Sequence, residues 1–132
     1  MKTLRIDHVV VATPDASAAA ATFRDHFDLA PSTPLAGSPT LRIGGARIAF
    51  VTPAAGTTLA AALASGGEGM AMVCLEVASL ADAEASLRQA GVGFTAETTG
   101  SGRVIAVDPA GAHGVRLTLI EGATHCVGDT LA

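Results

Sequence analysis

The chain has 132 residues, of which 49% are hydrophobic and 15% are charged, and its formal net charge is −4. This length suits one compact domain with a sizeable core, and the apolar content argues against a disordered chain. Eight Lys and Arg residues against twelve Asp and Glu leave no basic excess for phosphates, and Trp and Tyr, the best stacking platforms for bases, are absent. The composition therefore argues against a nucleic-acid partner.

From the start of the chain we expect neither a membrane span nor an export signal. Its apolar run Val9–Ala12 is far shorter than the roughly 20 residues of a spanning helix, and no long apolar run with a small-residue cleavage site follows a charged start. We expect a cytoplasmic protein without a membrane partner. The two cysteines, Cys74 and Cys126, form no CxxC pair, so we expect neither a disulfide framework nor a zinc motif, and we expect Cys74 to be a buried thiol.

The first half predicts a strand, a helix and a hairpin. The β-branched run Ile6–Ala12 is typical of a strand, and Asp15 stands where it would cap a helix over Ala16–Leu29. Apolar residues recur at helical spacing along that segment. Extended segments at Thr40–Ile43 and Ala46–Val51 flank two consecutive glycines, which indicate a tight turn.

The second half repeats this order. The run Met70–Val77 is strand-like, and a serine then caps a helix over Leu80–Ala90 that a glycine ends. Two further strands are expected at Arg103–Val107 and Gly114–Ile120.

The two halves correspond at an offset of 64 residues, so that His8 matches Met72 and Asp15 matches Ser79. Each half is a strand, a helix and two or three strands, and this period is too long for a solenoid. We therefore expect the two units to share one curved core. The predicted division is unit one at about 4–53, a connector with a short helix at 54–69, unit two at about 70–121 and a tail at 122–132.

Two βαβββ units resemble the vicinal oxygen chelate superfamily, which includes glyoxalase I, methylmalonyl-CoA epimerase, extradiol dioxygenases, fosfomycin-modifying enzymes and bleomycin-binding proteins. The resemblance covers about residues 4–121 and rests on four stretches, namely Ile6–Val9, Ile48–Pro53, Val73–Val77 and Asp108–Val115, the last looking most like the epimerase branch. It implies an α+β fold in which the two units form a curved mixed sheet around a cavity, with helices on the convex face. It also implies a homodimer.

In the metal-dependent members of the superfamily, the first and last strands of each unit supply His or Glu ligands. Carried onto this chain, the resemblance places His8 at one ligand position, and Ala49, Met72 and Thr118 at the positions where Glu, His and Glu are expected. Methionine and threonine are poor ligands for hard cations, and one imidazole alone does not hold a divalent ion. We therefore predict no metal and no other cofactor.

Alternation along the strands predicts which side chains accompany His8 on the inner face. Ile6 and Val10 should face inward with it on the first strand, which gives a largely apolar pocket with a few polar groups, as in small-molecule sites. The further residues expected to line the pocket are Arg47, Ala49, Val51, Met70, Met72, Cys74, Glu76, Arg116, Thr118 and Ile120.

Four of these side chains have candidate roles. His8 is the strongest candidate for a catalytic residue. It is either an acid–base group near neutral pH or a core histidine hydrogen-bonded to its surroundings. Arg47 and Arg116 either clamp a carboxylate or phosphate or lie at the rim of the sheet in water. Glu76 is either a second catalytic base or the ion-pair partner of an arginine.

Two functions follow. We favour a glyoxalase-like enzyme that acts on a small carbonyl or carboxylate compound by metal-independent proton transfer, of isomerase or lyase type, with His8 and Glu76 as catalytic groups. The substrate-binding residues would be Arg47, Ala49, Met72, Cys74, Arg116 and Thr118. The alternative is a non-catalytic binding protein of the bleomycin-resistance type that sequesters an apolar ligand. A structural or regulatory role is the weaker third possibility.

Overall fold

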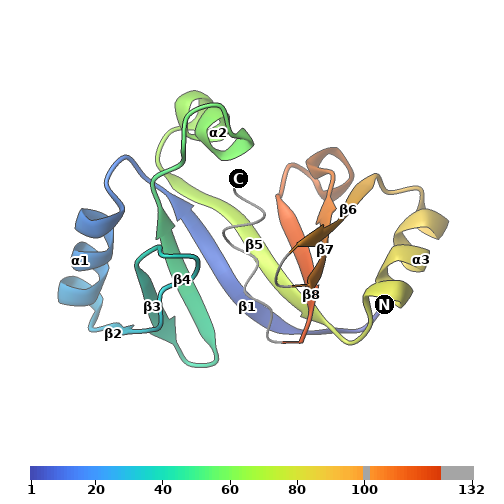
Figure 1. Cartoon of the computed structure of the whole chain (residues 1–132), viewed down its shortest axis with the longest axis horizontal. Coiled ribbons are helices and arrows are strands. Elements are labelled where there is room, and N and C mark those ends of the chain that lie inside the picture. The colour runs from blue at the N-terminus through green and yellow to red at the C-terminus, as the bar shows by residue number, and fades with distance from the viewer. Residues whose placement is uncertain (100–101, 123–132) are drawn as a thin grey trace.

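The computed structural model describes residues 1–99 and 102–122, and within them the chain forms one eight-stranded sheet with three α-helices (Figure 1). Most of the predicted tail at 122–132 lies outside the described residues. The elements in chain order are β1 (Thr3–Ala12), α1 (Ala16–Phe27), β2 (Ala30–Pro31), β3 (Thr40–Ile43), β4 (Ala46–Val51), α2 (Thr58–Gly66), β5 (Gly69–Val77), α3 (Leu80–Ala90), β6 (Phe94–Thr99), β7 (Gly102–Val107), a short 3-10 helix η1 (Pro109–Ala112) and β8 (Leu117–Glu121).

The sheet is curved and mixed, with strand order β2-β3-β4-β1-β5-β8-β7-β6. The first strands of the two units, β1 and β5, lie antiparallel at its centre, and each pairs in parallel with the last strand of its own unit, β4 or β8. Helices α1 and α3 lie outside the curved sheet at its two ends (Figure 1). The predicted α+β fold of two βαβββ units is confirmed.

Strand register shows the internal repeat residue by residue. In unit one Val9 pairs with Ile48 and Val10 with Ala49, while in unit two Val73 pairs with Leu117 and Cys74 with Thr118. Adding 64 to a residue number in β1 and 69 to one in β4 therefore gives the equivalent pair in unit two. This equivalence matches the predicted offset between His8 and Met72.

The helices of the two units begin and end as their caps dictate. The Asp15 carboxylate accepts a hydrogen bond from the amide of Ala18, and the Ser79 hydroxyl accepts one from Asp82. Gly91 ends α3 in the left-handed region at φ 73°, so the predicted bounds of that helix are confirmed. Helix α1 ends at Phe27, two residues before the predicted end.

Helix α2, in the connector, packs on a different face from α1. The α1 side of the sheet buries Leu41 and Phe50 together with Val11, whereas Leu59 of α2 packs against Val10 and Ala49. Because neighbouring residues of a strand point to opposite faces, these two clusters lie on opposite sides of the sheet. The expectation of helices on the convex face therefore holds for α1, and α2 covers part of the inner face. Within the described residues, no helix has the length and apolar character needed to cross a bilayer.

Candidate functional site

Asp7 and His8 are neighbours on β1, yet both side chains are fully buried. In a regular strand they would point to opposite faces. The register of β1 against β5 explains the difference, because Ile6 pairs with Leu75 and His8 with Cys74, which leaves Asp7 as the extra residue of a β-bulge. The bulge brings the two side chains together, with 2.7 Å between Oδ2 of Asp7 and Nδ1 of His8.

Two arginines hold the Asp7 carboxylate. Arg47 donates from Nη2 to Oδ2 at 2.8 Å, and Arg5 donates from Nη2 to Oδ1 at 2.8 Å. Arg5 also donates from Nε to Oε2 of Glu76 at 2.9 Å. Burial by itself raises the pKa of Asp7, but the hydrogen bond with His8 and the charge of Arg47 outweigh it and hold that pKa below its ordinary value. Asp7 is therefore an ionised acceptor at neutral pH.

An ionised Asp7 fixes the orientation of the His8 ring. A carboxylate only accepts hydrogen bonds, so the proton between the two side chains belongs to Nδ1 of His8. In the neutral ring, Nε2 then carries the lone pair. This atom is buried and has no hydrogen-bond partner in the part of the chain that the structure describes. Buried polar atoms are seldom left without a hydrogen-bond partner, so Nε2 is a candidate to accept a proton from a ligand.

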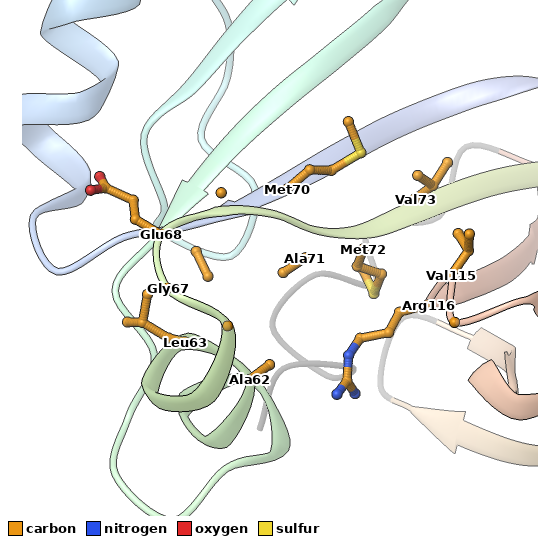
Figure 2. A pocket seen from close by; sticks show the side chains of 14 residues that line it. Ala62, Leu63, Gly67, Glu68, Met70, Ala71, Met72, Val73, Val115 and Arg116 are labelled. Atoms are coloured by element: carbon orange, nitrogen blue, oxygen red, sulfur yellow. The ribbon is translucent and has the colours of Figure 1, made fainter.

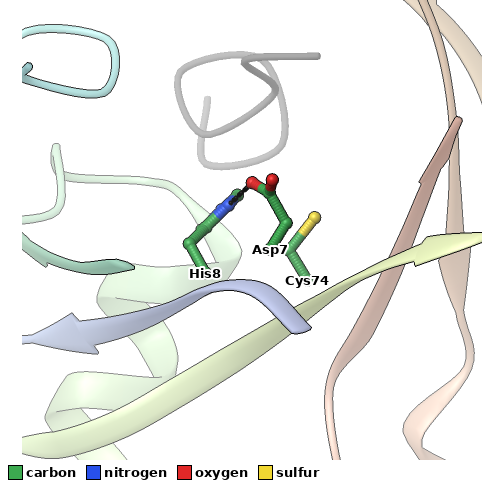
Figure 3. Close-up of side chains that lie close together, drawn as sticks. All are labelled: Asp7, His8 and Cys74. Carbon is green, nitrogen blue, oxygen red and sulfur yellow. Dashed lines mark hydrogen bonds and ion pairs between the residues drawn. The ribbon is translucent and has the colours of Figure 1, made fainter. Parts of the chain in front are cut away.

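Cys74 lies beside this pair, across the β1–β5 ladder (Figure 3). Donor atoms of Asp7, His8 and Cys74 all lie within 4.8 Å of one another, which raises the question of a metal ion. Both oxygens of Asp7 are already hydrogen-bonded, to two guanidinium groups and to the imidazole. A divalent ion bound there would have to displace these donors and lie against two positive charges, so this donor set does not fit one.

The four ligand positions implied by the family do not fit a divalent ion either. Ala49 has no donor atom and is fully buried in the core. The hydroxyl of Thr118 donates to Sδ of Met72 at 3.0 Å, so these two side chains are bonded to each other. Only His8 offers a donor suited to the metals of the family. We therefore derive no step through a metal, and metal independence stays a prediction.

Two clefts lie away from this cluster, and their linings share Met72 and Arg116. The first, of about 350 Å³, lies between α2, the start of β5 and the residues before β8. The second, of about 570 Å³, lies between β6, β7, the start of α2 and β8. Arg116 extends from the chain before β8 toward α2 (Figure 2). Neither lining includes Asp7 or His8.

The structure thus divides the predicted pocket between two places. His8, Arg47, Cys74 and Glu76 belong to the cluster around Asp7, which we call the Asp7 cluster. Met72, Arg116 and Thr118 line the clefts. Ala49 lies in the buried core cluster that also contains Val10 and Met72.

Two inward-facing residues, Ile6 and Met70, were predicted wrongly, and two charged residues were missed. Met70 is 69% exposed and points away from Met72 (Figure 2), because Ala71 is the extra residue of a bulge between them. Ile6 is 47% exposed instead of facing inward with His8, because the bulge at Asp7 shifts the alternation. The same bulge buries Asp7, which strict alternation directs outward. Arg5 was missed because strict alternation directs its side chain outward, whereas its partners, Asp7 and Glu76, lie on the inner face. The only signal for Asp7 in the sequence was its place beside His8.

Comparison with protein families places the chain. The model of the Glyoxalase/Bleomycin resistance protein/Dioxygenase superfamily matches residues 5–119. The chain belongs to this superfamily. Comparison with curated protein sequences gives no match.

Solved structures of the same fold include methylmalonyl-CoA epimerases. The Q60A variant of the Streptomyces coelicolor enzyme, in complex with 2-nitronate-propionyl-CoA, has 22% identity and a TM-score of 0.77, covering 92% of this chain and 99% of that one. The enzyme from Mycobacterium tuberculosis has 24% identity and a TM-score of 0.73, covering 89% of this chain and 87% of that one. A hypothetical protein from Bacillus halodurans C-125 has 20% identity and a TM-score of 0.75, covering 89% and 93%. At these identities the likeness shows the fold alone.

Proposed function

We propose that the chain is a small-molecule enzyme that moves a proton at a carbon next to a carbonyl group, without a metal. The observation that carries this proposal is the Nε2 atom of His8, which is unpaired among the described residues while Asp7 holds the other ring nitrogen. A histidine held in one tautomer by a carboxylate can act as a general base for proton transfer from carbon. The reaction is of isomerase or lyase type.

Each member of the Asp7 cluster has a part in this mechanism. Nε2 of His8 takes the proton from carbon, and ionised Asp7 stabilises the imidazolium that forms. Arg47 and Arg5 hold the Asp7 carboxylate in place, so they are positioning residues. Glu76 is bound to Arg5, and we assign it a positioning role in place of the predicted second base. Return of the proton to a different carbon, or to the opposite face of the same carbon, completes an isomerisation, whereas loss of a leaving group from the neighbouring carbon completes an elimination.

Deuterium exchange tests the proposal directly. Methylmalonyl-CoA and pyruvate are suitable probes, because both carry an acidic C–H next to a carbonyl, and proton NMR in D₂O follows loss of that signal. Conversion of His8 to Gln should slow enzyme-dependent exchange by roughly 100-fold or more. The matched control is His26→Gln, because His26 is an exposed histidine on α1 and the substitution should leave the rate unchanged.

Three results would contradict this function. One is an unchanged rate in a folded His8→Gln variant, and a second is the absence of exchange of either probe by the wild-type protein. The third is exchange that stops with a chelator and returns with a divalent ion, which would overturn metal independence.

One observation favours the second function, a non-catalytic binding protein. His8 is fully buried, whereas the two clefts with partly apolar walls lie elsewhere. On this alternative, ligands bind in a cleft and His8→Gln leaves binding unchanged while no probe exchanges. The homodimer and the cytoplasmic location stay predictions, and light scattering tests the first of them.

A further inference from the structure

The bulge that buries Asp7 has a counterpart in the second half of the chain. Val10 pairs with Met72 and Val11 with Met70, which leaves Ala71 as the extra residue on β5. Ala71 is the residue that the offset of 64 assigns to Asp7, just as Met72 corresponds to His8. Ala71 packs against the cluster that contains Met72 and Leu59, which shows that it faces the same side as its neighbour.

The arginine of the Asp7–Arg47 ion pair also has a counterpart. The offset of 69 on the last strands assigns Arg116 to Arg47. In the first half, Arg47 donates to the Asp7 carboxylate at 2.8 Å. In the second half, the equivalent of that carboxylate is the methyl group of Ala71. The Arg116 carbonyl accepts a hydrogen bond from the amide of Val73, but the guanidinium makes no hydrogen bond or ion pair with any other described residue.

The first cleft lies where the missing carboxylate would be. Ala71, Met72 and Arg116 all line it. Met72 and Arg116 point to the side of β5 that faces α2, where Ala62 and Leu63 form the opposite wall (Figure 2). Arg116 is therefore a half-buried residue that brings a positive charge to a cleft lined mostly by apolar residues and glycines.

We propose that Arg116 binds the carboxylate of an amphipathic ligand, in the position that Asp7 occupies in the other half. A guanidinium accommodates a carboxylate bidentately, and this pairing would repeat the Asp7–Arg47 contact with a ligand as the partner. The apolar tail lies in the first cleft, against Leu63, Ala71 and Met72.

Charge determines which cleft takes the ligand. The second cleft contains the carboxylates of Glu97 and Asp108, which repel an anionic ligand. In the first cleft the acidic residue is Glu68, and its Oε1 accepts a hydrogen bond from the Thr13 hydroxyl at 2.6 Å. This site does not depend on proton transfer by His8, because neither Asp7 nor His8 lines the cleft.

Titration calorimetry with octanoate tests the site, with 1-octanol and octylammonium as neutral and cationic probes of similar length. We expect octanoate to bind and the other two to bind at least tenfold more weakly. Arg116→Met should weaken octanoate binding by roughly tenfold or more, because it removes a hydrogen bond between charged groups. Arg42→Met is the matched control, since Arg42 is an exposed arginine on β3 outside both clefts.

Ala71→Asp is the sharper variant, because it would supply Arg116 with the internal partner that Arg47 already has. It should lower octanoate affinity as much as Arg116→Met does, with a melting temperature no lower than that of the wild type. His8→Gln should leave octanoate binding unchanged, so failure of the proton-transfer function is separable from failure of this site. Three results would each overturn the proposal. They are equal affinity for octanol and octanoate, equal losses of octanoate affinity in Arg42→Met and Arg116→Met, and no binding of octanoate to the wild type.

Discussion

Replacement of Asp7 by Asn should destabilise the fold, because it removes the negative charge on which two arginines converge. The Asp7 side chain is 0% exposed, that of Arg47 14% and that of Arg5 40%. Removing one partner of a buried ion pair costs about 3–5 kcal/mol. Water screens the Arg5 contact, and Asn still accepts one hydrogen bond, so we expect a loss of about 2–4 kcal/mol. This corresponds to a fall in melting temperature of about 10 °C.

The pH dependence of this loss identifies its cause. The pKa of Asp7 in the folded state lies below its ordinary value, as burial raises it less than His8 and Arg47 lower it. The stabilisation is therefore fully present above the unfolded-state pKa of about 3.9 and is lost as the pH falls through the folded-state pKa. The difference in unfolding free energy between wild type and Asp7→Asn should be constant from pH 5 to 7 and should shrink below about pH 4.

Urea denaturation across that pH range is the assay, and Asp25→Asn is the control. Asp25 also pairs with an arginine, Arg24, but its side chain is 65% exposed. Its replacement should change the stability by less than about 0.5 kcal/mol. If Asp7→Asn were no more destabilising than Asp25→Asn, or if its effect were the same at pH 3 and pH 7, then the network would not hold Asp7 ionised and the orientation assigned to His8 would fail.

Two further predictions concern the parts of the fold that support the site. Phe50 is 0% exposed and its ring centroid lies 5.0 Å from that of Phe23, so Phe50→Ala should cost about 3–5 kcal/mol in urea denaturation. Phe27→Ala, at a position 62% exposed, should cost far less, and similar losses would contradict the packing described. Ser79→Ala removes the N-cap of α3 and should cost about 1 kcal/mol in thermal unfolding. Retained stability there would show that the cap is dispensable.

Local signals and the repeat predicted the elements and the two-unit division, and the resemblance to the superfamily added the curved mixed sheet. Ser79 and Gly91 mark both ends of α3, because a capping hydroxyl and a left-handed residue are local requirements of a helix. The offset of 64 was readable because equivalent strands keep the same register, as Val10–Ala49 and Cys74–Thr118 show. Both kinds of signal are repeated or local, so a single sequence contains them.

The centre of the Asp7 cluster was not predictable in the same way. A bulge changes the direction of one side chain, and neither Asp7 nor Ala71 carries a composition signal such as a glycine that would announce one. Strict alternation therefore placed Ile6 inside and left Asp7 out. Because the bulge was not predictable, two roles stayed open for Arg47. Its partner Asp7 lies on the neighbouring strand and reaches Arg47 only because of the bulge.

The comparison of the two halves also sets a lower limit on the size of the ligand. Asp7 is part of the chain, so its ion pair with Arg47 forms without the loss of translational and rotational freedom that a separate ligand would pay on binding Arg116. One charge-assisted contact does not offset that loss, whereas each buried CH₂ group adds roughly 0.8 kcal/mol. Acetate should therefore fail to bind where octanoate binds, although both carry the same head group. If acetate bound as tightly, the apolar wall of Leu63, Ala71 and Met72 would have no part in recognition, and Arg116 would be a simple anion site.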